Sequence, residues 1–141
     1  MRRAVCGLAA AVVLAACGSA VAGQIAWAPS YEAAVKKAKA VKKPLMIDLY
    51  TDWCGWCKKL DSDVYNKDEV IELSKEFVCL KLNPEKDKKN GKKFQVEGFP
   101  TIFFLDSAGK EINKIVGFRP ADKFAAEMKK ALEAAKGKSK E

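Results

Sequence analysis

Histidine is absent from this chain of 141 residues, and only five cysteines are present. A structural zinc ion takes four ligands, nearly always Cys or His, so a zinc site here would have to use thiolates alone. The sequence also has no glycine-rich phosphate-binding loop and no internal repeat. We therefore expect neither a metal nor an organic cofactor, and any electron transfer must use the cysteines themselves.

Acidic residues and lysine are missing from the first 23 residues. Arg2 and Arg3 precede an apolar stretch over residues 4–14, which is the pattern of a secretory signal peptide. We predict a targeting segment over residues 1–22 and one domain over residues 23–141, because about 120 residues suffice for a single hydrophobic core.

Two cleavage sites compete at the end of this segment. Residues 14–17 (Leu-Ala-Ala-Cys) resemble the lipobox of bacterial lipoproteins, which would make Cys17 the lipidated N-terminus. Residues 20–22 (Ala-Val-Ala) form a site for ordinary secretion. We favour the lipobox because such a short apolar region ends naturally at Ala16. An uncleaved anchor is a third alternative, since residues 4–22 are just long enough to span a bilayer.

Each of these alternatives exports the domain to an extracytoplasmic compartment, the periplasm. The favoured one anchors it to the membrane as a lipoprotein, and simple cleavage would secrete it to the periplasm. Exported thiols meet an oxidising environment.

The chain is basic, with 26 Lys and Arg against 18 Asp and Glu, a net charge of +8. The excess is concentrated in residues 86–93 and 136–140, where lysines occur without interleaved aromatic side chains. Such runs are typical of a solvated surface, with contact to anionic lipid headgroups as the alternative. We expect no nucleic-acid partner for an exported chain, and we expect a monomer.

Cys54 and Cys57 follow an apolar stretch and begin a predicted helix, separated by Gly55 and Trp56. This C-x-x-C arrangement is typical of a redox dithiol, because residues three apart are neighbours on a helix. Cys54 would lie at the helix N-terminus, where unpaired N–H groups and the helix dipole stabilise a thiolate. We predict Cys54 as the exposed attacking thiol and Cys57 as the less accessible resolving thiol.

Three other interpretations of this pair stay open. The pair could be half of a zinc site, an inert structural disulfide, or the Cu(I) ligands of a non-enzymatic metallochaperone. The lack of histidine, and of a methionine close to the pair in sequence, argues against the metal sites. A metal titration of the reduced protein would decide.

The rest of the sequence predicts an α/β domain with a small mixed β-sheet flanked by helices on both faces. The expected strands cover residues 44–50, 77–82, 101–105 and 111–116. The first expected helix follows Ser30, and the second begins at Cys54 and breaks near Asn66. The third covers residues 68–75 and is capped by Asn66 or Asp68. A short fourth helix ends at Val96, and the last helix follows Pro120. Cys79 lies in the second strand, where we expect a buried core thiol, with a resolving or mixed-disulfide role as the alternative.

Residues 35–132 resemble the thioredoxin family in several separated features. Asp48 lies six residues before Cys54, and Trp53 directly precedes that cysteine. The loop Gly98-Phe99-Pro100-Thr101 resembles the cis-proline loop of the family, and Lys81 stands where the family pairs a lysine with the buried acid. Gly117 matches the glycine after the last strand.

Residues 27–61 look closer to the extracytoplasmic thioredoxin-like proteins, including the C-terminal domain of the DsbD reductase, than to cytosolic thioredoxin. The dipeptide Gly55-Trp56 departs from the Gly-Pro of thioredoxin and from the Pro-His of the oxidant DsbA. The redox potential therefore stays open.

The resemblance implies a thioredoxin fold and a role for each matching residue. Asp48 would be a buried acid that takes the proton of Cys57, or alternatively one half of a structural ion pair with Lys81. Pro100 would be cis and would keep Cys54 away from Cys79 and from metals. Backbone groups of Phe99 and Thr101 would bind an extended peptide, and Trp53 and Trp56 would contact the partner protein.

These observations predict an extracytoplasmic thiol–disulfide oxidoreductase that reduces protein disulfides. Its electrons would come from a membrane-embedded donor, because reduced pyridine nucleotides are not available outside the cytoplasm. A disulfide oxidase or isomerase is the alternative within the same enzyme class. The reduction potential discriminates the two, since thioredoxin lies near about −270 mV and DsbA near about −120 mV.

Overall fold

The computed structural model of the protein describes residues 23–138. The predicted targeting segment, its cleavage sites and Cys17 lie outside the described residues. Among residues 23–138, no helix combines the length and the apolar character needed to cross a membrane.

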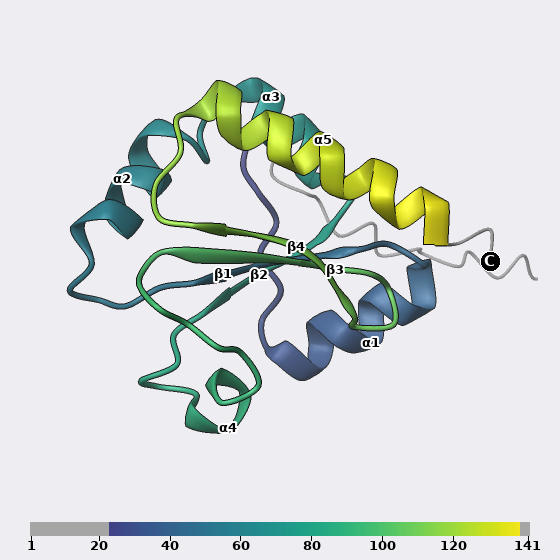
Figure 1. The fold of residues 1–141 in the computed structure, drawn as a ribbon, viewed down its shortest axis with the longest axis horizontal. Helices are drawn as coiled ribbons and strands as arrows, with labels where there is room; N and C mark the ends of the chain where they lie inside the picture. Colours follow the sequence, from purple (N-terminus) through teal and green to yellow (C-terminus); the bar gives the residue numbers. More distant parts are fainter. Residues whose placement is uncertain (1–22, 139–141) are drawn as a thin grey trace, which may run out of the picture.

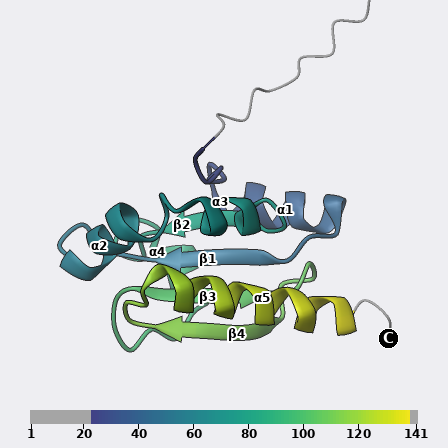
Figure 2. The same cartoon turned by 90° about the horizontal axis from the view of Figure 1, so that it is seen from above.

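Four strands form one mixed sheet, as predicted. The strands are β1 (Leu45–Leu49), β2 (Val78–Leu82), β3 (Thr101–Leu105) and β4 (Glu111–Val116). Their order is β2-β1-β3-β4, and Figure 2 shows them side by side in this order. The strands β1 and β2 run parallel, whereas β3 is antiparallel to both β1 and β4.

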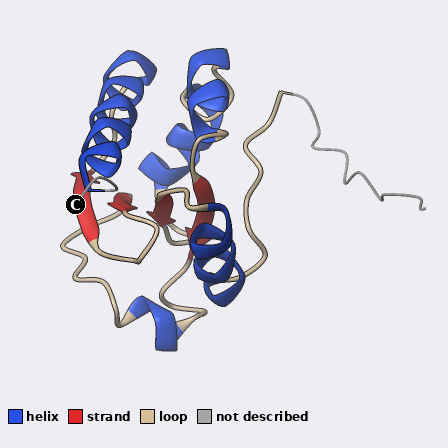
Figure 3. Ribbon diagram, turned by 90° about the vertical axis from the view of Figure 1, so that its right-hand side faces the viewer, coloured by secondary structure: helices blue, strands red, loops and turns tan. Residues whose placement is uncertain are grey.

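Helices cover both faces of the sheet, which also confirms the prediction. The helices are α1 (Tyr31–Val41), α2 (Gly55–Asp63), α3 (Asp68–Ser74), α4 (Lys88–Gly91) and α5 (Ala121–Lys138). In Figure 1, α2, α3 and α5 lie above the sheet, while α1 and α4 lie below it. Figure 3 shows the same two helical layers around the strands from another side.

The sheet separates two hydrophobic cores. Successive side chains of a strand point to opposite faces, so Met46 of β1 joins the core under α2, α3 and α5, while Leu45 and Ile47 join the core over α1. All five residues of β1 are buried. This explains its nearly continuous apolar sequence, since a strand covered on both faces needs apolar side chains on both.

Local signals at the helix ends were only partly predictive. The side chain of Ser30 accepts a hydrogen bond from the Ala33 N–H, which confirms it as the cap of α1. The predicted cap of α3 is wrong, because Lys67 occupies that position and makes no side-chain cap bond. The side chain of Asn66 instead donates to the Ser62 carbonyl at 2.6 Å, at the end of the preceding helix.

The short helix α4 is also placed differently from the prediction. It ends at Gly91 and not at Val96. Its N-cap, Asp87, accepts hydrogen bonds from the backbone and side-chain amides of Asn90. These bonds start the helical turn early, so α4 lies ahead of its predicted end.

The segment before α1 adds a short extension to the sheet that the sequence did not reveal. Trp27 forms a parallel bridge with Cys79, and the Ala28 N–H donates to the Cys79 carbonyl at 2.8 Å. The segment therefore covers part of the otherwise open edge of β2 (Figure 2). It also places the Trp27 ring over the same face as α2.

Candidate active site

The two cysteines lie at the first turn of α2, shortly after the end of β1. Cys54 is the N-cap residue with an extended backbone, and Cys57 lies one turn into the helix. A disulfide joins them, with 5.3 Å between their Cα atoms. The Cys57 N–H donates to the Cys54 sulfur at 3.1 Å. The sulfur thus takes the place of a capping oxygen, and the same contact would stabilise a thiolate in the reduced protein.

The predicted exposure of Cys54 is wrong for the disulfide-bonded form. Cys54 is 5% exposed and Cys57 is 3% exposed, so both are buried. Cys57 belongs to the buried face of α2. Because the disulfide ties Cys54 to this inward-facing partner, its side chain is drawn toward the domain.

Two exposed tryptophans flank the disulfide. Trp53 is 67% exposed, and Trp56 is 58% exposed. The Trp53 indole N–H donates to Glu85 at 3.0 Å, and its ring meets Phe99 edge-on with 5.9 Å between centroids. The Trp56 ring lies 5.6 Å from that of Phe118. Each ring is thus held on one side and open to solvent on the other.

The loop before β3 contains the cis peptide predicted at Pro100. The Pro100 carbonyl accepts from the Gly117 N–H at 2.8 Å. Thr101 is buried, paired with Leu49 and Val116 in the neighbouring strands, and donates its hydroxyl to the Gly98 carbonyl. The contact predicted between its backbone groups and a peptide stays a prediction. In the described chain the Phe99 backbone N–H and carbonyl have no hydrogen-bond partner.

Asp48 is fully buried on β1, on the sheet face that α2 covers. The Tyr65 hydroxyl donates to its Oδ2 at 3.0 Å, whereas Oδ1 has no partner among residues 23–138. Burial raises the pKa of Asp48 to about 6, although the Lys81 charge and the Tyr65 hydrogen bond act in the opposite direction. At neutral pH this carboxyl is mostly ionised and can accept a proton.

Lys81 does not form the predicted ion pair with Asp48. The two residues are register partners on β2 and β1, but the Lys81 ammonium pairs with Asp61 of α2. It also lies between 5.3 and 5.5 Å from the ring centroids of Trp27, Tyr50 and Tyr65. The long lysine side chain reaches a carboxylate that is partly exposed, where less desolvation opposes the pair.

The sequence interpretation missed two residues of this cluster. Asp61 follows Cys57 by four residues, so the two share one face of α2, a signal that could have identified it. Tyr65 lies in the turn after α2, and no spacing rule connects it with Asp48. Only the path of the chain through space brings these two side chains together.

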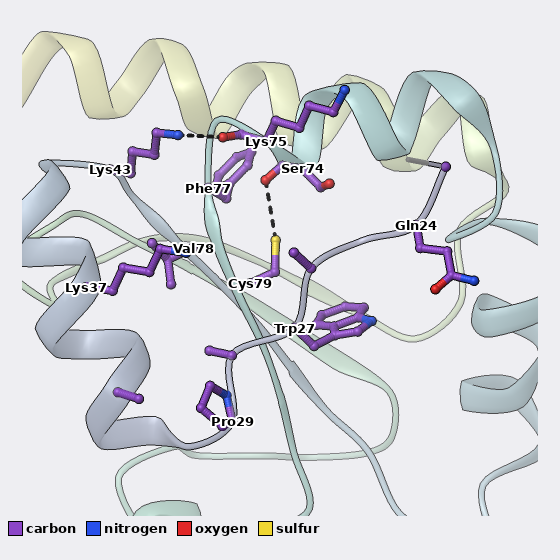
Figure 4. Close-up of a pocket in the computed structure, with 14 residues that line it drawn as sticks. Gln24, Trp27, Pro29, Lys37, Lys43, Ser74, Lys75, Phe77, Val78 and Cys79 are labelled. Carbon is purple, nitrogen blue, oxygen red and sulfur yellow. Dashed lines mark hydrogen bonds between the residues drawn. The ribbon is translucent and has the colours of Figure 1, made fainter. Parts of the chain in front are cut away.

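Cys79 is a buried core thiol, as predicted. It is 2% exposed, its sulfur donates to the Ser74 carbonyl at 3.6 Å, and burial raises its pKa to about 12. It borders a cavity of about 480 Å³ between residues 23–29, α1 and β2, which Figure 4 shows. No dithiol residue lines that cavity.

Among residues 23–138, no three His, Cys, Asp or Glu side chains form a group that could hold a metal ion.

Comparisons with known proteins agree with this geometry. The family described as Thioredoxin-like domain matches residues 31–132. The thiol:disulfide interchange protein DsbD of Pectobacterium atrosepticum is 35% identical over 94 residues, which cover 62% of this chain and 16% of DsbD. The DsbD of Pseudoalteromonas atlantica is 32% identical over 108 residues, 72% of this chain and 18% of that protein. The chain thus spans less than a fifth of the length of these relatives.

Solved structures are similar as well. A thioredoxin from Thermus thermophilus superposes with a TM-score of 0.71 at 24% identity, covering 79% of this chain and 90% of that one. The oxidised C-terminal domain of DsbD from Neisseria meningitidis gives a TM-score of 0.60 at 26% identity, covering 71% of this chain and 90% of that domain. The chain therefore belongs to the thioredoxin-like family of thiol–disulfide oxidoreductases, with Cys54 and Cys57 as its dithiol.

Proposed function

We propose that this protein reduces disulfides of other exported proteins. The observation that carries the proposal is the Cys54–Cys57 disulfide at the N-terminus of α2, with the Cys57 N–H directed at the Cys54 sulfur. This contact favours the charged form of one particular sulfur. The likeness to DsbD supports exchange with a membrane-embedded electron donor.

The two thiols alone supply the two electrons that the reduction of a substrate disulfide needs. In the reduced protein, the Cys54 thiolate attacks one sulfur of the substrate disulfide, and the other substrate sulfur leaves as a thiolate. Cys57 then loses its proton to Asp48 and attacks the Cys54 sulfur. The Cys54–substrate bond breaks, the second substrate sulfur leaves, and two electrons have passed from the dithiol to the substrate.

The surface around the dithiol supports contact with an extended peptide. Trp53 and Trp56 are exposed aromatic residues next to the two cysteines in the sequence, and tryptophan is frequent at binding sites. The unpaired backbone groups of Phe99 are suited to bond a substrate strand. Pro100 holds this loop against Gly117, and Thr101 ties it to Gly98.

The proposed location rests on the sequence. Arg2, Arg3 and the apolar residues after them favour export, and the lipobox at residues 14–17 favours a lipid anchor on Cys17. An anchored domain would stay close to a membrane-embedded donor. Residues 23–138 carry the dithiol chemistry.

The roles of the two cysteines can be separated by trapping. In Cys57→Ala, we expect the mixed disulfide between Cys54 and a substrate peptide to accumulate, because no resolving thiol is left. In Cys54→Ala, we expect no adduct. Cys79→Ala is the control, since this thiol is buried and should leave turnover unchanged. The adducts are measured by mass spectrometry, and an adduct carried by Cys57 in the Cys54 variant would reverse the assignment.

The direction of the reaction is measured by equilibration with glutathione. A protein that works as a reductase should have a reduction potential close to that of thioredoxin, about −270 mV. A potential near that of DsbA, about −120 mV, would identify an oxidase instead.

Replacing Asp48 with Asn tests the proton acceptor. Attack by Cys54 should be little changed, because it depends on the helix terminus, while resolution by Cys57 should slow by roughly a hundredfold near neutral pH. Stopped-flow reduction of a model disulfide measures both steps. Unchanged resolution would remove Asp48 from the reaction.

Asp48→Asn should also change stability in a pH-dependent way. Because the pKa of Asp48 is raised from 3.8 to about 6, the native state binds the proton more tightly than the unfolded chain does, and stability falls as pH rises through this window. The neutral variant avoids this loss. Its advantage should be small at pH 4 and reach about 3 kcal/mol at pH 7, measured by urea unfolding. A variant less stable than wild type at pH 7 would contradict this account.

Replacing Cys17 with Ala tests the anchor. If the lipobox is used, the variant should lose fatty-acid labelling and move from the membrane to the soluble fraction. A wild-type N-terminus found at Gly23 would establish simple secretion instead.

A further inference from the structure

Tyr65 is the direct hydrogen-bond partner of Asp48 within residues 23–138, and no family feature of the sequence pointed to it. We infer that Tyr65 is a positioning residue for Asp48: its hydroxyl holds Oδ2 of the carboxylate and leaves Oδ1 to take the proton of Cys57. This inference rests on the proposed function, because it assigns a task to Tyr65 in the resolving step.

The position of the Tyr65 hydroxyl is set by the core and not by Asp48. The Tyr65 ring packs edge-on against Trp27, with 5.2 Å between centroids, and against Phe124, with 5.6 Å. The residue is only 7% exposed. With the ring held on two sides, the hydroxyl is presented to Oδ2 at 3.0 Å.

The hydroxyl acts as a permanent donor. Burial, followed by the neighbouring Asp48 charge, raises the pKa of Tyr65 well above its usual value of 10.0, so the phenol keeps its proton throughout the neutral range. A donor that cannot ionise stabilises the charged form of its acceptor more than the neutral form. Tyr65 therefore favours the ionised carboxylate, the form that can accept a proton.

The other groups around Asp48 are less suited than Tyr65 to stabilise its ionised carboxylate. Lys81 from β2 adds a positive charge, but its ammonium is paired with Asp61 of α2, whose own charge acts on Asp48 in the opposite direction. On β3, the register partner of Asp48 is the apolar Ile102. Cys57 of α2 and Cys79 of β2 are buried thiols on this side of the sheet.

In the resolving step, one proton moves from Cys57 to Asp48. The Cys57 thiol transfers its proton to Oδ1, and its sulfur forms the bond to Cys54 as the substrate sulfur departs with the electron pair. Tyr65 keeps its own proton. Tyr65, Asp61 and Lys81 line an open hollow of about 440 Å³, so this side of the cluster adjoins solvent, whereas Asp48 itself is fully buried.

The test is Tyr65→Phe in the full chain, which keeps the ring and removes only the hydroxyl. Loss of a hydrogen bond to a charged group changes a protonation equilibrium by roughly tenfold, so the pKa of Asp48 should rise by about one unit. Carbon-13 NMR of the Asp48 carboxyl in the oxidised protein measures it directly. The resolving rate should fall about fivefold at pH 6, change little at pH 8, and leave attack by Cys54 unaltered.

Two controls make the result decisive. Tyr31→Phe removes a hydroxyl on the opposite face of the sheet and should leave the Asp48 titration unchanged. Placing 3-fluorotyrosine at position 65 gives a stronger donor and should lower the Asp48 pKa, a second test if the Phe variant folds poorly. An Asp48 titration that neither substitution moves would overturn the inference. Because this titration needs no turnover, it is independent of the proposed function, which fails instead if the reduction potential lies near that of the oxidant DsbA.

Discussion

The burial of β1 on both faces is the constraint on which the rest of the structure depends. The strand lies between β2 and β3 with helices over both of its faces, and each of its five residues is buried. A one-residue shift in the register of this strand would exchange the side chains of the two buried faces and carry Asp48 into the core over α1. The chain leaves it directly for the turn that ends at Cys54, so the dithiol is carried by the most firmly enclosed element of the domain.

Asp48 is the single charged residue in this enclosed strand. Its ionisation is opposed by burial and assisted by Tyr65 and Lys81, and the balance leaves its pKa near 6. A carboxyl poised there is suited to exchange protons at neutral pH. The rings of Trp27, Tyr50 and Tyr65 lie around the Lys81 ammonium, whereas the rings of Trp53 and Trp56 are exposed beside the disulfide.

Patterns within short stretches of the sequence were sufficient to predict much of this arrangement. The strands β3 and β4 have the predicted bounds, because their apolar, β-branched and aromatic residues and the short turn between them lie within one stretch of the sequence. The dithiol, its place at a helix N-terminus and the buried Cys79 followed from spacing and residue type. The cis peptide at Pro100 and the burial of Asp48 followed from resemblance to the thioredoxin family.

The amino-acid sequence by itself therefore determined the four strands, the helices apart from α4, the double-sided strand and the reactive pair, since these depend on neighbours in the chain. Only the tertiary structure decided that Lys81 pairs with Asp61, that Tyr65 bonds Asp48, that Trp27 joins the edge of β2 and that Thr101 is enclosed between strands. The physical reason is that each of these contacts joins segments distant in sequence. A long side chain such as lysine reaches several acceptors, and desolvation in the folded domain selects among them.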